Sequence, residues 1–311
     1  MNTRQLTYLL ACARTGSIAA AARELDVAQP SISQQLAALE HELKTVLLER
    51  DHKGVRLTAA GEQFAQAARG ALEQLDTARL DLQDAGEPSG KVAIGMTQPT
   101  GNALAIPLYA DISRRYPGIE LDLYTGLSTT LYEQLRKGEV DLLVSSPDTS
   151  DHMGMSSELL LQERLLLAVG NIQDSDNPLA ALCQREQIRW AELAQLPVMF
   201  TGYKDSLGYR IGQYEQLTGI RLQRAQPFGQ LMTTLRYVSE GYGLLICPST
   251  AIYPQLRSGE LHALRIVEPD LSRAVNLVHM HDRPRSRAAR LVAERVKVLS
   301  QQLVDEGVWQ V

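Results

Sequence analysis

The chain of 311 residues has little of what marks secreted, metal-binding or membrane-spanning proteins. Its three cysteines, Cys12, Cys183 and Cys247, are far apart and form no close metal-ligand pair, so we expect reduced and mostly buried thiols. No run approaches the roughly 18 apolar residues of a membrane span, and the N-terminus lacks the layout of a secretory signal. These absences predict a cytoplasmic protein with no membrane partner, no metal and no other cofactor.

Motifs of catalysis are also missing from the sequence. It has no glycine-rich phosphate loop, no nucleophile elbow and no HExxH pattern. His279 and His281 alternate along a predicted strand, but no cysteine or carboxylate nearby completes a recognised ligand pattern. We therefore predict that the chain is not an enzyme and that this histidine pair is structural.

The length and the charge of the chain limit its domain organisation and the ways in which it could bind nucleic acid. A single core rarely grows beyond about 250 to 300 residues, so this length predicts a small head and a larger part of one or two lobes. The net charge of −5 argues against a protein that coats nucleic acid non-specifically. Residues 1–60 nevertheless carry seven lysines and arginines against six acids, and four of the seven lie between Lys44 and Arg56. Basic groups are therefore clustered where a local DNA contact would need them.

The beginning of the sequence predicts two short helices. An apolar stripe at helical spacing is formed by Leu6, Leu9, Leu10 and Ala13. The first helix should end at Gly16, and Ser17 has the chemistry to cap a second helix over residues 18–25.

A third helix is predicted from Gln29 and Pro30, because proline in a first turn loses no hydrogen bond. Its inward side chains are Ile32, Leu36 and Leu39. Two helices joined by a three-residue turn, the second with a polar outer face, are typical of a DNA-binding helix-turn-helix. The predicted DNA contacts here are Ser17, Gln29, Pro30, Ser31, Ser33 and Gln34. A polar face that only solvates a surface helix is the alternative.

A hairpin and a long helix follow. Short apolar-rich runs at residues 46–50 and 55–57 flank a turn with Gly54, which predicts a wing. Arg50, Lys53 and Arg56 would lie on this wing and contact the DNA backbone, with a solvated charge as the alternative for each.

Thr58 can cap a helix that runs to about residue 85. Its apolar stripe, with a 3.5-residue repeat, is formed by Phe64, Ala68, Ala71, Leu75, Ala78 and Leu82. Such a stripe suits a partner helix, so we predict a homodimer. The alternative is that the stripe packs on the chain's own second part.

Beyond a linker at residues 86–90, short apolar strands alternate with helices, which indicates parallel sheets with crossover helices. Strands are expected at 92–95, 119–124, 140–144, 165–169, 198–200, 244–246 and 275–280, and helices at 103–116, 129–137, 230–239 and 286–303. Ligands of such sheets bind beyond the carboxyl ends of strands, at helix N-termini.

The hydroxyl-rich segments at these strand ends predict a ligand site. The predicted effector-binding residues are Thr97, Gln98, Thr100, Ser128, Thr129, Thr201 and Gly202. Hydroxyls and helix N-termini favour a small anion or carboxylate. A capping serine or threonine without any ligand would give the same pattern.

Short sequence motifs in the first 61 residues indicate a protein family more specifically than the predicted helices do. They are residues 17–22 (SIAAAA), residues 28–36 (AQPSISQQL), Leu39, Glu40, Leu48, Arg50 and residues 57–61 (LTAAG). Together they resemble the N-terminal signature of LysR-type transcriptional regulators. The resemblance implies a winged helix-turn-helix, a long linker helix that dimerises, and an α/β effector domain of two lobes similar to periplasmic binding proteins. It also implies a tetramer built from two kinds of dimer.

On this reading the domains are a DNA-binding domain at 1–58, a linker helix at 59–86, a hinge at 87–90, one effector lobe at 91–162 with 269–311, and a second lobe at 163–268. The expected function is transcription regulation, with DNA binding or bending controlled by a small effector in the cleft between the lobes. The expected partners are double-stranded DNA, the effector and further copies of the chain as homodimer and homotetramer, with RNA polymerase as a further candidate.

The sequence also departs from the family pattern and leaves alternatives. Lys44 stands where the family usually has glycine, so the turn into the wing is expected to differ in detail. Residues 154–158 are similar to the same region of members that control nitrogen assimilation. A redox sensor of the same family is disfavoured by the spacing of the cysteines. A pure solute-binding protein would not need the head.

Overall fold

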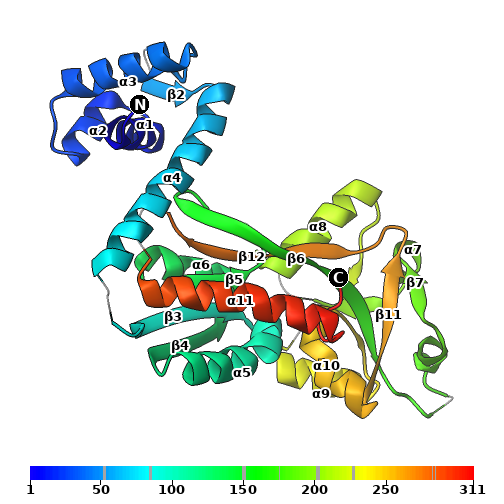
Figure 1. Cartoon of the computed structure of the whole chain (residues 1–311). Coiled ribbons are helices and arrows are strands. Elements are labelled where there is room, and N and C mark those ends of the chain that lie inside the picture. The colour runs from blue at the N-terminus through cyan, green and yellow to red at the C-terminus, as the bar shows by residue number, and fades with distance from the viewer. Residues whose placement is uncertain are drawn as a thin grey trace. The chain divides into compact units, whose positions relative to one another are not determined.

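The computed structural model describes residues 1–51, 54–83, 86–148, 152–174, 176–200, 204–225, 228–281, 283 and 285–311 (Figure 1). It divides into two compact units. The head unit comprises Met1–Ala85 with His281–Pro284, and the second unit comprises Gly86–Met280 with Arg285–Val311. Within the described residues, no helix has both the length and the apolar character that crossing a membrane requires.

The described residues of the head unit form four helices and a hairpin. They are α1 (Thr3–Thr15), α2 (Ile18–Glu24), α3 (Gln29–Leu43), β1 (Leu48–Asp51), β2 (Gly54–Leu57) and α4 (Ala59–Gln83). Gly16 ends α1 in the left-handed conformation, and the Ser17 hydroxyl accepts a hydrogen bond from the Ala20 N–H at 3.3 Å. Thr58 caps α4 by accepting from the Gly61 N–H at 2.9 Å. The predicted helix starts and the wing hairpin are therefore confirmed.

The core of the head confirms the predicted inward face of the third helix. Ile32, Leu36 and Leu39 are all buried. The predicted stripe of the first helix is wrong in part, because Leu10 and Ala13 are only half-buried. Helix α1 packs against α2, α3 and α4, so its buried face is wider than one stripe and includes Tyr8 and Cys12 among others.

The turn from α3 into the wing depends on two residues. Lys44 ends α3 with a φ of 51°, a left-handed conformation that glycine adopts without strain. The Glu40 carboxylate accepts from the backbone N–H groups of Leu47 at 2.7 Å and Leu48 at 3.0 Å. The turn therefore keeps a glycine-like conformation despite the lysine, and Glu40 fixes the start of the hairpin.

The second unit is an α/β structure around one continuous sheet. Its strands are β3 (Ser89–Thr97), β4 (Gly118–Gly126), β5 (Leu142–Ser145), β6 (Met155–Gly170), β7 (Gln187–Arg189), β8 (Pro197–Met199), β9 (Gln223–Arg224), β10 (Leu244–Pro248), β11 (Leu261–Val267) and β12 (Ser272–Met280). The strand order is β4-β3-β5-β12-β6-β10-β8-β9, and β11 pairs with β6 and β7.

The helices of this unit cover both faces of the sheet. They are α5 (Gln98–Arg115), α6 (Ser128–Lys137), α7 (Trp190–Leu193), α8 (Ser206–Thr218), α9 (Leu231–Ser239), α10 (Ser249–Ser258) and α11 (Arg287–Asp305), with a 3₁₀ turn, η1, at Ala180–Gln184. Helices α5 and α11 share one core with β3, whereas α6 packs on the opposite face (Figure 1). A separate core surrounds β8 and β10, which gives the two lobes.

The expectation of parallel sheets holds only in part. Strand β3 is parallel to β4 and β5, as expected. Strand β6 is antiparallel to β10, β11 and β12. Its 16 residues also extend well beyond the predicted segment 165–169. The first half of β6, residues 155–162, mixes polar residues with three leucines and is only partly buried, so it lacks the continuous buried apolar run of residues 165–169.

The glycine of the family motif at residues 57–61 allows a close approach of two backbones. A Cβ atom on Gly61 would lie 2.1 Å from the Leu47 carbonyl oxygen. We expect Gly61→Ala to destabilise the head by roughly 1–3 kcal/mol through overpacking. Amide hydrogen exchange in α1–α3 of the full chain measures this loss.

Gly70→Ala is the matched control, because Gly70 lies on the same helix and no heavy atom would lie within 4 Å of its new Cβ. It should stabilise α4 by roughly 0.5–1 kcal/mol. Equal protection in the two variants would show that the approach of Gly61 to Leu47 does not constrain the head.

Candidate nucleic-acid interface and effector cavity

The outer face of α3 gathers the polar residues predicted to read DNA. Gln29, Pro30 and Gln34 are exposed, and Ser31 and Ser33 are half-buried. The buried apolar side chains of α3 hold the helix on the head core, so this polar face is directed away from the core. The sequence therefore brings these five residues onto one short helical surface.

The other predicted DNA contacts have different surroundings. Ser17 is half-buried, and its hydroxyl caps α2. Arg56 is exposed on β2, where it pairs in register with Glu49. Arg50 lies in β1 opposite Val55, but its side chain and the whole of Lys53 lie outside the described residues.

A cavity of about 130 Å³ opens in the second unit, at the carboxyl ends of strands. The described residues that line it are Thr97, Gln98, Pro99, Gly126, Leu127, Phe200, Asp205, Ser206, Leu207, Phe228, Gly229, Leu231, Thr234, Leu245, Ile246, Cys247, Pro248, Ala251 and Arg273. Both lobes contribute to this wall, because α5 begins in one core and β10 belongs to the other. A ligand in the cavity would therefore contact both lobes.

The predicted effector residues are only partly gathered at this cavity. Thr97 and Gln98 line it. Thr100 is buried and its hydroxyl lies 2.9 Å from that of Thr97. Ser128 is buried beside Asp205, whereas Thr129 is half-buried and outside the lining. Thr201 and Gly202 lie outside the described residues.

The sequence reasoning missed most of the apolar lining. Among them, Phe200 follows β8, Leu207 lies in the first turn of α8, Ile246 lies in β10 and Phe228 precedes α9. Hydroxyl-rich segments after strands pointed to polar lining residues only. Phe200 and Ile246 lie at the ends of predicted strands, which was the available signal for them, whereas no pattern in the sequence pointed to Leu207 or Phe228.

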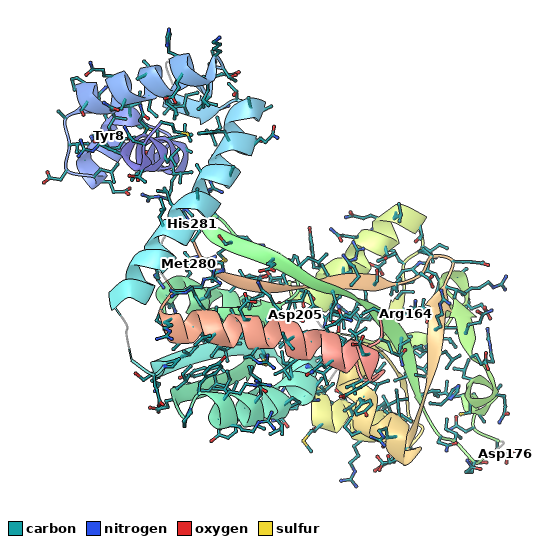
Figure 2. All side chains as sticks on the ribbon, in the orientation of Figure 1. Tyr8, Arg164, Asp176, Asp205, Met280 and His281 are labelled. Carbon is teal, nitrogen blue, oxygen red and sulfur yellow. The ribbon has the colours of Figure 1, made fainter. Side chains whose placement is uncertain are left out.

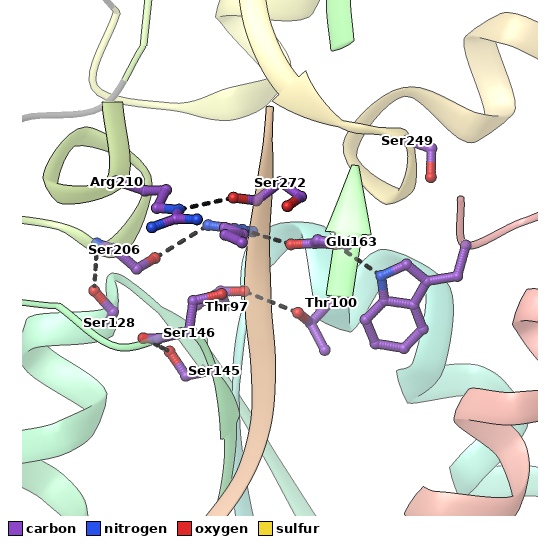
Figure 3. Close-up of polar contacts among 12 residues, drawn as sticks. Thr97, Thr100, Ser128, Ser145, Ser146, Glu163, Ser206, Arg210, Ser249 and Ser272 are labelled. Atoms are coloured by element: carbon purple, nitrogen blue, oxygen red, sulfur yellow. Dashed lines mark hydrogen bonds and ion pairs between the residues drawn. The ribbon is translucent and has the colours of Figure 1, made fainter. Parts of the chain in front are cut away.

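A buried ion pair lies where the lobes join. The Arg273 Nε donates to Glu163 Oε1 at 2.5 Å, and both side chains are buried. The Trp309 Nε1 donates to the other carboxylate oxygen of Glu163 at 2.7 Å. Arg273 Nη1 donates to the Ser206 hydroxyl at 3.1 Å. Strand β12, strand β6, the C-terminal segment and α8 are therefore connected by one set of hydrogen bonds (Figure 3).

The starts of α6 and α8 are bonded to each other. The backbone N–H and the hydroxyl of Ser128 both donate to Asp205 Oδ1, at 3.0 and 2.6 Å. The Ser206 N–H donates to the Ser128 hydroxyl at 3.0 Å. Asp205 is the N-cap residue of α8, yet its side chain makes no capping bond to α8. A carboxylate of one lobe therefore caps the helix of the other lobe.

The cysteines give no sign of a redox site. Cys12 and Cys247 are buried and Cys183 is half-buried. Burial raises the pKa of Cys247, and the charge of Arg273 only partly opposes this shift. A thiol with a raised pKa is a poor nucleophile toward peroxide. Among the described residues, no cluster of histidine, cysteine and carboxylate side chains is placed to hold a metal ion.

A helix-turn-helix head joined by a long helix to a two-lobed domain with a cavity defines a DNA-binding regulator with a ligand domain. A family model described as "Bacterial regulatory helix-turn-helix protein, lysR family" matches residues 3–62, and one described as "LysR substrate binding domain" matches residues 85–299. The chain belongs to the LysR family of transcription regulators, whose members are not enzymes.

Known relatives and solved structures agree with this assignment. The nitrogen assimilation regulatory protein nac of Escherichia coli is 28% identical over 313 residues, which cover 100% of this chain and 99% of that protein. The transcriptional regulator GltR of Bacillus subtilis is 27% identical over 267 residues, 85% of each chain.

Among solved structures, CbnR, a LysR family transcriptional regulator, has a TM-score of 0.55 and 25% identity, and covers 95% of this chain and 100% of its own. The oxidized form of OxyR from Corynebacterium glutamicum has a TM-score of 0.53 and 22% identity, and covers 99% and 92%. The OxyR likeness concerns the fold alone.

Removal of the Glu163 charge should destabilise the second unit. Glu163→Gln leaves the buried Arg273 without its counter-charge, so we expect a loss of about 3–5 kcal/mol in the free energy of unfolding. Both tryptophans, Trp190 and Trp309, lie in the second unit. Urea unfolding followed by tryptophan fluorescence therefore reports on this unit.

The double variant Glu163→Gln with Arg273→Met is the control, because it removes both charges together. It should recover part of the lost stability, since the remaining cost of a buried unpaired charge disappears. A single variant as stable as the unchanged chain would mean that the ion pair does not hold this junction.

Proposed function

We propose that this chain is a sequence-specific DNA-binding regulator whose DNA binding or bending is controlled by a small effector in the cavity between the lobes. The observation that carries the proposal is the exposed polar face of α3, fixed on the buried side chains Ile32, Leu36 and Leu39. A helix of this kind enters the major groove, and glutamine can pair with adenine there. The likeness to CbnR, which has been solved with its target DNA, supports the same role.

The proposed active form is a dimer through α4, with a tetramer as the larger assembly. Ala65 and Ala68 are buried within the head unit, so the first turns of α4 belong to the chain's own core. Further along, Leu75 is 54% exposed. An exposed leucine on the predicted stripe supports a partner helix over this part of α4. RNA polymerase stays a candidate partner on family grounds alone.

Control would work through the relative arrangement of the lobes. The chain crosses between them within β6, where Arg164 still pairs with β12 and Leu165 already pairs with β10, and again between β11 and β12. A ligand that contacts both lobes shifts the equilibrium toward the arrangement that it binds more tightly. We propose that this shift changes the spacing or bending of DNA bound by the paired heads.

The predicted effector is an anion or carboxylate. In its favour, Ser128 presents two donors to one carboxylate oxygen at the start of α6. That carboxylate is the chain's own Asp205, so an anionic effector at this place would have to displace it.

The α3 surface can be tested against the DNA upstream of the chain's own gene. We expect Gln34→Ala to weaken specific binding by about 1–3 kcal/mol and to leave non-specific binding unchanged, because Gln34 would read a base edge. Arg56→Ala should instead weaken both and lower the salt slope by about 1, because Arg56 would contact a phosphate. Fluorescence anisotropy over a range of salt concentrations separates the two effects.

Gln63→Ala, which removes an exposed glutamine from α4, is the control and should bind like the unchanged chain. If the double variant Gln34→Ala with Gln29→Ala keeps specific binding, the α3 surface does not read the operator. If the unchanged chain shows no salt-sensitive, sequence-preferring DNA binding, it is not a DNA-binding regulator.

The dimer has its own test. Leu75→Lys places a charge on the exposed stripe and should raise the dimer dissociation constant by at least about tenfold, since burial of lysine without a partner is costly. Gln63→Lys places the same charge outside the stripe and should have little effect. Sedimentation velocity of the full chain measures both, and equal dimerisation of the two variants would exclude α4 as the interface.

A further inference from the structure

The charged residues in the cavity wall do not favour binding of an anion. Its described ionisable lining residues, apart from Cys247, are Asp205 and Arg273. The charge of Arg273 is neutralised by Glu163 at 2.5 Å. These ionisable lining residues and the partner of Arg273 therefore comprise two carboxylates and one guanidinium. The described wall therefore offers an incoming anion no uncompensated positive charge.

Donors of Ser128 and Arg273, next to Asp205 and in the cavity wall, are already used within the chain. The N–H and hydroxyl of Ser128 donate to Asp205. Arg273 donates from Nε to Glu163 and from Nη1 to Ser206. Figure 3 shows Ser128, Ser206 and Glu163 in this connected set. Asp205 therefore stands at the helix N-terminus where an effector carboxylate would otherwise be stabilised.

The remaining lining is mainly apolar and comes from both lobes. Leu127 contributes from one lobe, and Phe200, Leu207 and Ile246 contribute from the other. The volume of about 130 Å³ is similar to the roughly 150 Å³ of an apolar cavity that holds benzene. Thr97, Gln98 and Thr234 add a few polar groups. A small ring-sized ligand with one hydrogen-bonding group matches this wall in size and polarity.

We propose that Asp205 is an internal ligand of the α6 N-terminus, and that the cavity consequently takes an uncharged, mainly apolar small molecule rather than an anion. This inference rests on the proposed function, in which the cavity binds the effector. An anion would lie near Asp205 and be repelled, and it would find the Ser128 donors occupied. An uncharged ligand fills the apolar volume while the bond between α6 and α8 stays intact. Asp205 thus determines ligand class.

Three probes of similar shape test the ligand class on the full chain: benzoate, benzamide and benzyl alcohol. Ligand-observed NMR titration gives each dissociation constant. We expect the unchanged chain to bind the two uncharged probes, and to bind benzoate at least about tenfold more weakly than benzamide. In Asp205→Ala the donors of Ser128 become available, so the ratio of benzoate to benzamide affinity should rise at least about tenfold.

Asp176→Ala is the matched control. It removes the same charge from an exposed turn of the second unit, far from Asp205 (Figure 2). It should leave the affinity ratio unchanged. Asp205→Asn keeps an oxygen that can accept from Ser128, so it provides a folded variant if the alanine variant is unstable. Its ratio should also shift toward benzoate, because the repelling charge is gone.

Three results would overturn the proposal: benzoate binding to the unchanged chain as tightly as benzamide, an affinity ratio that neither Asp205 variant changes, or no binding of the two uncharged probes. Failure of the proposed function is a different result. A probe that occupies the cavity while operator binding and bending stay the same would argue against regulation through this cavity and leave the ligand class intact.

Discussion

The second unit depends on one buried ion pair at the junction of its lobes. Glu163 and Arg273 lie opposite each other on β6 and β12, and Trp309 and Ser206 make further hydrogen bonds with them. A buried charge is tolerated only when it is paired and fully hydrogen-bonded. Since the partners come from four segments that are distant in sequence, the pair also specifies how these segments meet. The cavity and the contact between α6 and α8 are built beside this junction.

The head follows a simpler principle. Its core is apolar, local side chains cap α1, α2 and α4, α3 starts with a proline in its first turn, and the polar face lies on α3. Local caps and a short-range core allow this part to be specified by about 60 residues of sequence. The two units are therefore organised differently. An apolar core supports the polar face of α3, whereas a polar junction between the lobes lies beside the cavity.

The sequence and the structure agree best where hydrophobic periodicity is strong. The starts of α2 and α3, the wing and the strands β3, β4 and β10 follow from caps, turns and apolar runs. They agree least at β6, whose first half mixes polar and apolar residues and is only partly buried, and at α8 and α10, which were not expected. At the cavity, polar residues at strand ends pointed to Thr97 and Gln98 but gave no sign of Asp205, whose partner Ser128 is 77 positions away in the sequence.

The sequence by itself determined the helix-turn-helix head, its polar face, the alternation of strands and helices, and through its motifs the LysR family. These features depend on residues that are close in the sequence, so the spacing of apolar, capping and turn residues predicts them. Only the tertiary structure decided that Glu163 faces Arg273, that Asp205 caps the helix of the other lobe, and that the cavity is mainly apolar. Those pairings join residues 77 and 110 positions apart, and hydrogen bonds at such separations leave no periodic trace in the sequence.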